Sequence, residues 1–211
     1  MTIHNMTIIQ QVYNIFMQNF SFLYRLIHHF KTISKHKIIV TKLCFKCGLY
    51  KQGILHDLSK YSPIEFFAGV KYYQGYRSPI DREREVVGFS RGWLHHEGRN
   101  PHHWEHWIDK DYKNIKFIVI TMPTNYLIES VLDRIAASKN YNPNYDDNAP
   151  LQFFDRGRDK IFMGEENAKR IRFLLEYLSL NGEEKALAFY TLLYKEYKKD
   201  NTFDVLSYIE S

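Results

Sequence analysis

The chain has 211 residues, of which 45% are hydrophobic and 25% charged, so it is long enough to bury one sizeable core. Its 10 Gly, 6 Pro and 16% aromatic residues exclude the low-complexity, collagen-like and disordered classes. The net charge of +5 mildly favours a polyanionic partner or substrate. The basic residues are scattered, however, which argues against a dedicated nucleic-acid-binding role.

The sequence predicts neither a membrane protein nor a secreted one. The most apolar early stretch, residues 8–30, contains several Gln and Asn side chains and an Arg, which do not suit a membrane span. The N-terminal sequence has no basic region or small-residue cleavage site typical of a secretion signal. Two cysteines make no disulfide framework, so we expect a cytoplasmic protein. Cys44 and Cys47 have C-x-x-C spacing, but they follow a helical pattern, which favours two small core residues.

Apolar residues recur at helical spacing along the first half of the chain, and the same holds further on, so we predict an all-α fold with a single domain. The pattern predicts helices over 7–31, 34–47 and 50–58. Ser34 is the expected N-cap of the second, and Gly48 its expected stop. The sequence Ser62-Pro63-Ile64-Glu65 is a capping box that opens a helix through residue 73, followed by a loop over 75–80.

In the second half, Ser90 is expected to cap a helix that Gly98 stops, and Asn100-Pro101 to restart one over 102–107. Strand signals are weak and occur only near 117–120. Pro123 opens a helix to about residue 138, and a loop rich in Asn, Asp and Pro follows over 141–150. Two last helices are predicted over 165–180 and 183–199.

Histidine is the unusual feature of the composition, because five of the ten histidines lie within residues 95–106: His95, His96, His102, His103 and His106. A metal site needs imidazoles and carboxylates from several rigid elements. His36, the adjacent pair His56-Asp57, and Asp133 are far enough apart in the chain to lie on different helices. Adjacent side chains diverge on a helix, so His56 and Asp57 can share a metal only near a helix end.

These residues carry a family resemblance. His36, then His56-Asp57 within HDLSK, then Asp133 in Asp133-Arg134-Ile135-Ala136, resemble the H…HD…D signature of the HD-domain superfamily of metal-dependent phosphohydrolases. Residues 53–63 and 93–105, with the motifs HDLSK and WLHHEGRNPHHWE, are also similar to a family of small bacterial and phage proteins of unassigned function. The resemblance covers about residues 33–180. It therefore implies an HD-like metal-binding core there. Outside that range, we expect an N-terminal amphipathic helix over 1–32 that packs on the core, and a C-terminal helix and tail over 181–211.

The resemblance implies one or two bound divalent metal ions. The first would be held by His36, His56, Asp57 and Asp133. The second would be held by His95 and one or more of His96, His102 and His103, with Asp57 as a bridge. Iron, manganese, zinc, nickel and cobalt are the expected metals, with magnesium as a further candidate. His95-His96-Glu97 and Lys60 are also similar to motifs of cyclic-dinucleotide phosphodiesterases, but Ser59 replaces a glycine of those enzymes, so that substrate is not implied.

The expected function is hydrolysis of a phosphoester in a nucleotide-like small molecule by a metal-activated water. Asp57 and Lys60 are expected to be catalytic, and Lys60, Arg99 and Arg134 to bind the phosphate oxygens. The oligomeric state stays open.

Three alternatives remain. One is a di-iron oxidoreductase or oxygenase of the HD type, and another is a non-catalytic nucleotide-binding HD module. The third treats His102-x-x-Glu105-His106 as the H-x-x-E-H motif of a zinc metallopeptidase, which would leave His36 without a role.

The sequence leaves the roles of several residues ambiguous. Asp133 lies opposite the apolar stripe of its helix, which suits a solvated face, yet nearby alanines also suit a helix packed on both sides with a polar cavity along one of them. The aromatic residues near the histidines could line the site or simply pack: Trp93, Trp104 and Trp107. Outside any ligand set, we expect three histidines to be incidental: His4, His28 and His29. His106 is left undecided.

Overall fold

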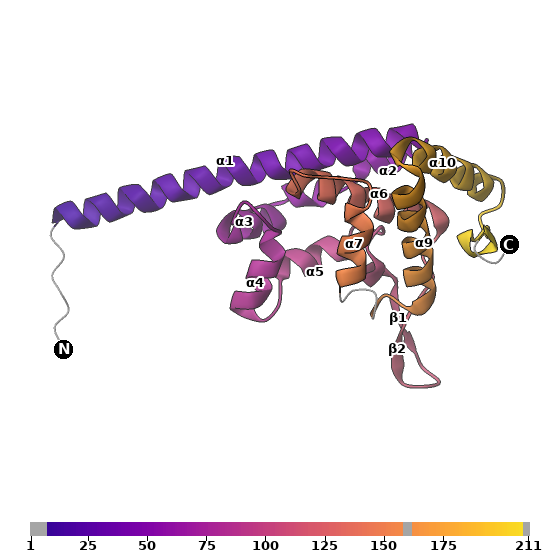
Figure 1. The fold of residues 1–211 in the computed structure, drawn as a ribbon. Coiled ribbons are helices and arrows are strands. Elements are labelled where there is room, and N and C mark those ends of the chain that lie inside the picture. The colour runs from indigo at the N-terminus through magenta and orange to yellow at the C-terminus, as the bar shows by residue number, and fades with distance from the viewer. Residues whose placement is uncertain (1–7, 158–161, 209–211) are drawn as a thin grey trace.

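The computed structural model describes residues 8–157 and 162–208 and is almost entirely helical, which confirms the all-α prediction (Figure 1). The α-helices are α1 Ile8–Lys46, α2 Tyr50–Leu55, α3 Pro63–Tyr72, α4 Pro79–Val87, α5 Arg91–Glu97, α6 Thr124–Tyr141, α7 Ala149–Arg156, α9 Glu165–Asn181 and α10 Glu183–Lys199. Short 3-10 helices are η1 Leu58–Tyr61, η2 Trp104–Trp107 and η3 Val205–Tyr208. Strands β1 Ile108–Asp111 and β2 Lys116–Val119 form an antiparallel hairpin.

The first helix is continuous, where the sequence predicts two. No Gly or Pro interrupts residues 31–34, and the Thr32 hydroxyl donates to the carbonyl of His28 one turn back, so the helix carries on. Ser34 is therefore not an N-cap, and its hydroxyl lies 3.1 Å from that of Tyr61. The expected boundary between residues 32 and 33 falls inside α1, whose N-terminal half extends beyond the other elements (Figure 1). Gly48 ends the turn after this helix at φ +77°, as predicted.

The link that carries His56 and Asp57 leaves the helix earlier than predicted. α2 ends at Leu55, and His56 is already extended, with φ −46° and ψ 126°. Asp57 is left-handed, at φ 54°, an arrangement that Asp tolerates better than most side chains. These two backbone changes turn neighbouring side chains toward one place, which a regular helix would not allow.

Two predicted helix starts are confirmed by their capping bonds. The Ser62 hydroxyl accepts from the backbone N–H of Glu65 at 3.5 Å, and the Ser90 hydroxyl accepts from that of Trp93 at 2.9 Å. Other segments differ from the prediction. Residues 102–107 form turns and a 3-10 helix, the weak strand signal belongs to the β1–β2 hairpin, and α4 and α7 were not predicted as helices.

The hydrophobic core lies between α1, α6, α9 and α10, and α6 is at its centre. Both cysteines are free and buried in this core, as expected for small packing residues. The apolar side chains of α6 that fill it are fully buried: Leu127, Ile128, Val131, Leu132, Ile135 and Ala136. Because apolar residues surround most of α6, its carboxylates Glu129 and Asp133 are carried into the interior rather than into solvent.

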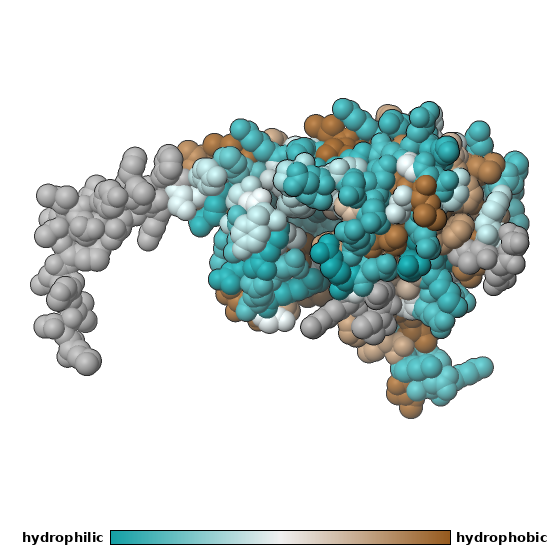
Figure 2. Space-filling view, viewed as in Figure 1, coloured by the Kyte–Doolittle hydropathy of each residue, from teal (hydrophilic) through white to brown (hydrophobic). Residues whose placement is uncertain are grey.

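None of the described helices has an apolar stretch long enough to cross a bilayer. Hydrophilic residues dominate the face of the molecule in Figure 2. Apolar residues such as Ile115 are nevertheless exposed at the far end of the hairpin.

Candidate metal centre

A first group of possible ligands gathers where α1, the link after α2 and α6 meet. His36 Nε2 lies 2.8 Å from Asp133 Oδ1 and 3.6 Å from Asp57 Oδ2. His56 Nε2 lies 3.3 Å from the same oxygen of Asp57 and 3.5 Å from Asp133 Oδ1. The four side chains offer one donor atom each, all within 4.8 Å of one another. The structure thus brings together the four residues expected to hold the first metal ion.

A second group surrounds the other oxygen of Asp57. His96 Nε2, from α5, lies 3.2 Å from Asp57 Oδ1, and His102 Nε2 lies 3.5 Å from it. His103 Nε2 approaches His96 Nε2 to 3.0 Å. Asp57 therefore presents one oxygen to each group, which is the arrangement of a carboxylate that bridges two ions.

The donor atoms fit metal ions better than they fit one another. His36 Nε2, His56 Nε2, His102 Nε2 and both Asp57 oxygens are buried and make no hydrogen bond of good geometry, although Lys60 Nζ forms an ion pair with Asp57 Oδ2. Metal–nitrogen and metal–oxygen bonds of about 2.1 Å separate neighbouring ligand atoms by about 3.0 Å in an octahedron and about 3.4 Å in a tetrahedron. The closest separations within the two groups, 2.8–3.6 Å, span these values. Buried polar atoms that converge without hydrogen bonds are the pattern that a coordinated ion would satisfy.

Glu129, one helical turn before Asp133, supports both groups from behind. Its Oε1 lies 2.9 Å from His56 Nδ1 and 3.3 Å from His102 Nδ1. A carboxylate that accepts from Nδ1 fixes the ring tautomer and leaves Nε2 free to bind a metal. The sequence signal that could have indicated this role is a second carboxylate on the same helix face as Asp133.

Glu65 has a similar position on the side of α5. Its Oε2 lies 2.8 Å from His96 Nδ1 and its Oε1 2.5 Å from His95 Nδ1. The carboxylate therefore does not close the capping box that the sequence predicts. Instead, the backbone N–H of Ser62 donates to the carbonyl of Ser59. His95 contacts Glu65 and belongs to neither donor group, so the structure does not bring it to the second metal position.

Lys60 supplies a positive charge beside the bridging carboxylate. Its Nζ lies 2.5 Å from Asp57 Oδ2, with about a quarter of the side chain exposed. Burial opposes the charged form, but Asp57 and Asp133 raise the pKa of Lys60 above its ordinary value. This expected catalytic residue is thus a fixed cation at the edge of the first donor group.

Carboxylates favour the protonated form of two of the histidines when no metal is bound. Burial acts to lower the pKa of His56, but Asp57, Asp133 and Glu129 outweigh it and hold that pKa well above the usual value. The pKa of His96 is raised in the same way, by Asp57 and Glu65 against burial. Metal ions that bind here would take the place of these protons.

The two arginines expected to bind phosphate, Arg99 and Arg134, have partners outside the two donor groups. Arg99 is exposed and donates to the carbonyl of His95. Arg134 donates to the carbonyl and hydroxyl of Ser130 and lies over the ring of Phe154, so its guanidinium is engaged outside both groups.

The structure shows the contacts of two histidines outside the donor groups, His106 and His29. His106 Nδ1 faces the carbonyl of Glu97, and its segment is a 3-10 helix, so the two histidines of the H-x-x-E-H motif do not share an α-helical face. His29, expected to be incidental, is buried against Phe66 and Gly69. His4 lies outside the described residues.

Comparison with known proteins adds a family match but no activity. Residues 25–177 match the profile of a family of unknown function, DUF5662, and this range contains every residue of the two donor groups. No curated protein and no solved structure matches the chain.

Proposed function

The chain belongs to this family of unknown function, and we propose that it is a metal-dependent phosphohydrolase that holds two divalent ions across Asp57. The observation that carries the proposal is the division of the Asp57 carboxylate between two groups of buried donor atoms. Two ions about 3.5–4 Å apart, bridged by a common ligand, are typical of enzymes that hydrolyse phosphoesters. The resemblance of His36, His56-Asp57 and Asp133 to the HD signature supports the same reaction.

Ions bound at these positions would supply the activation of water and the neutralisation of phosphate charge that hydrolysis requires. Water would form a new P–O bond, the ester P–O bond would break, and the alcohol would leave with a proton. Lys60, fixed by Asp57, would hold a non-bridging phosphate oxygen at the edge of the site. Glu129 and Glu65 would keep His56, His102 and His96 in the tautomers that bind metal.

The test is a hydrolysis screen of phosphorylated metabolites with purified protein. Manganese, iron, cobalt, nickel, zinc or magnesium is supplied in turn, and released phosphate is measured. We expect turnover with at least one metal and none with Asp57→Ala. If no compound is hydrolysed with any metal, the proposal is wrong.

A second candidate is oxygen chemistry at two irons, because the second group contains three histidines around one carboxylate oxygen, and nitrogen-rich sites suit iron. Iron in the protein as isolated, with an absorption band that changes on exposure to oxygen or peroxide, would favour it over hydrolysis. Colourless zinc protein would count against it. Binding of metal and nucleotide without turnover would instead favour a non-catalytic module.

A further inference from the structure

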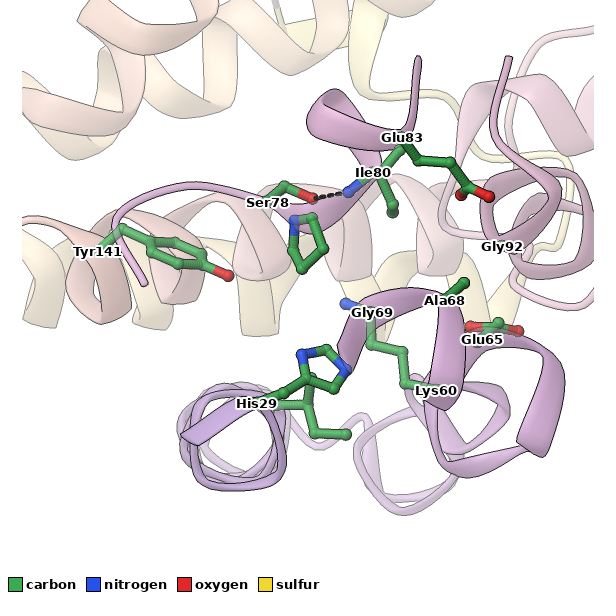
Figure 3. A pocket seen from close by; sticks show the side chains of 12 residues that line it. His29, Lys60, Glu65, Ala68, Gly69, Ser78, Ile80, Glu83, Gly92 and Tyr141 are labelled. Atoms are coloured by element: carbon green, nitrogen blue, oxygen red, sulfur yellow. Dashed lines mark hydrogen bonds between the residues drawn. The ribbon is translucent and has the colours of Figure 1, made fainter. Parts of the chain in front are cut away.

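A pocket of about 550 Å³, counting its open mouth, lies between α1, α3, α4, α5 and the end of α6. Figure 3 shows its lining, with His29, Lys60 and Glu65 on one side and Ser78, Ile80 and Glu83 opposite. None of its lining residues is a member of the two donor groups.

The pocket shares a wall with the candidate metal centre. Lys60 lines it, and the ammonium of that residue contacts Asp57 Oδ2. Glu65 also lines it, and its carboxylate contacts Nδ1 of His96, a member of the second donor group. A single side chain, that of Lys60, therefore separates a molecule in the pocket from the Asp57 carboxylate. This is where the organic part of a substrate would lie if its phosphate reached the metal ions.

The charges of the pocket do not suit a second phosphate group. Among the described lining residues, the sole Lys or Arg is Lys60, and its ammonium, beside Asp57, is already assigned to the phosphate group that reacts. Two carboxylates, Glu65 and Glu83, face the same space. Burial and then Lys60 lower the pKa of His29 to about 4, so its imidazole is neutral at pH 7. The two carboxylates repel additional anions and can accept hydrogen bonds from neutral polar groups, while most of the remaining lining is apolar, as at Ile33, Pro79 and Ile80.

Glu83 offers the clearest hydrogen-bond acceptor. It is buried, and its Oε2 accepts from the Ser90 hydroxyl at 2.5 Å. A carboxylate can accept about four hydrogen bonds, so capacity remains for hydroxyl donors of a ligand. Sugars are often bound in this way, by a carboxylate that accepts from their hydroxyls.

One wall of the pocket is formed by small residues of two helices. A Cβ atom at Gly92 would lie 3.5 Å from the Cβ of Ala68 and 3.6 Å from Glu83 Oε2, both ordinary contact distances. An alanine there would narrow the pocket without a clash. At Gly69 the situation differs, because a Cβ would lie 2.2 Å from the His29 ring. Gly92 is thus the position at which the pocket can be changed while the fold is kept.

We propose that this pocket binds the uncharged, polyhydroxylated alcohol part of a phosphomonoester, a sugar or a nucleoside, and that it rejects substrates with further phosphate groups. The hydrolysis step rests on the proposed function, whereas the binding of the alcohol in the pocket does not depend on it. Hydrolysis would convert the monoester and water into the free alcohol and inorganic phosphate.

The first test compares substrates. Adenosine 5′-monophosphate, ribose 5-phosphate, adenosine 5′-triphosphate and butyl phosphate are offered under one metal condition. We expect kcat/KM to be at least about 10-fold higher for the two hydroxyl-bearing monoesters than for the triphosphate or for butyl phosphate. The ratio between adenosine monophosphate and ribose phosphate shows whether the base also contacts the pocket. Equal rates for the monophosphate and the triphosphate would overturn the proposal.

The second test uses matched variants. Gly92→Ala should raise KM for the monoesters by about 10-fold, and Gly98→Ala, in the same region of the chain but outside the pocket lining, should not. Glu83→Gln keeps an oxygen for the Ser90 hydroxyl but removes the charge, so it should reduce discrimination against the triphosphate. No difference between Gly92→Ala and Gly98→Ala would contradict the assigned pocket.

A third measurement needs neither metal nor turnover. In saturation-transfer NMR with chelator-treated protein, adenosine should receive magnetisation from the wild type and from Gly98→Ala, but not from Gly92→Ala. If adenosine binds in this way while no phosphoester is hydrolysed, the proposed function fails and the pocket assignment stands. If phosphoesters are hydrolysed but the pocket variants change neither binding nor selectivity, the pocket assignment fails and the function stands.

Discussion

Glu129 is the residue whose replacement most sharply tests the architecture of the candidate centre, because one carboxylate oxygen serves both donor groups. Its Oε1 lies 2.9 Å from His56 Nδ1 and 3.3 Å from His102 Nδ1, and only 5% of the side chain is exposed. Loss of such a supporting carboxylate lowers metal affinity by about 10- to 100-fold, or about 1.4–2.7 kcal/mol. Glutamine retains the shape and one oxygen acceptor, but it loses the negative charge that strengthens hydrogen bonds from the two imidazoles. We therefore expect Glu129→Gln to weaken binding about 10-fold, and Glu129→Ala about 100-fold.

The assay is a competition titration of zinc between the protein and a coloured chelator, fitted to two sites. Glu184→Gln is the matched control, because this exposed residue of α10 undergoes the same chemical change away from the donor groups. Circular dichroism of the metal-free variants separates a loss of affinity from a loss of fold. If Glu129→Gln and Glu129→Ala bind zinc as tightly as Glu184→Gln, Glu129 does not orient the two histidines. A loss confined to one site would show that it orients only one of them.

Three other predictions follow from the same geometry. Asp57→Asn should keep its fold, since Asn also tolerates the left-handed conformation at φ 54°, but it should bind at most one metal ion, as measured by elemental analysis. His103→Gln should lose the second ion and His95→Gln should retain both, because only His103 belongs to a donor group. Metal affinity should fall as the pH is lowered, because the raised pKa of His56 means that a proton must leave before a metal ion binds. Calorimetry in buffers of different ionisation enthalpy should record the protons released on metal binding.

The sequence predicted much of the fold because the signals involved are local. Capping residues such as Ser62 and Ser90 act within one turn of a helix, and their bonds are present in the structure. The prediction of a break between two helices near Ser34 was wrong because the local signal there is ambiguous. A serine can cap a helix or bond within one, and nothing local separates these roles unless Gly or Pro ends the preceding helix.

The sequence could predict most of the residues that form the candidate site, but not how they divide between two donor groups. Spacing and resemblance pointed to His36, His56, Asp57 and Asp133, and the structure brings these four together. Which histidine of the pair His95 and His96 contributes a donor atom depends on the direction of α5, which turns His96 toward Asp57 and His95 toward Glu65.

Residues with two plausible roles were the hardest to assign. Glu65 fits a capping box by its sequence position, yet its carboxylate bonds to histidines some 30 residues later in the chain. His29 looked incidental because no metal-binding partner lies near it in the sequence, whereas packing between α1 and α3 makes it part of a pocket wall. Roles of this kind depend on tertiary contacts, which local patterns do not encode.

The central claim is that the two donor groups each hold a metal ion across Asp57. The most direct measurement is elemental analysis of the 211-residue chain, purified without a metal-affinity tag, incubated with transition metals and passed through a desalting column. We predict two ions per chain for the wild type. A wild-type protein that retains one ion per chain or fewer, whichever of iron, manganese, zinc, nickel or cobalt is supplied, would contradict two-metal binding across Asp57.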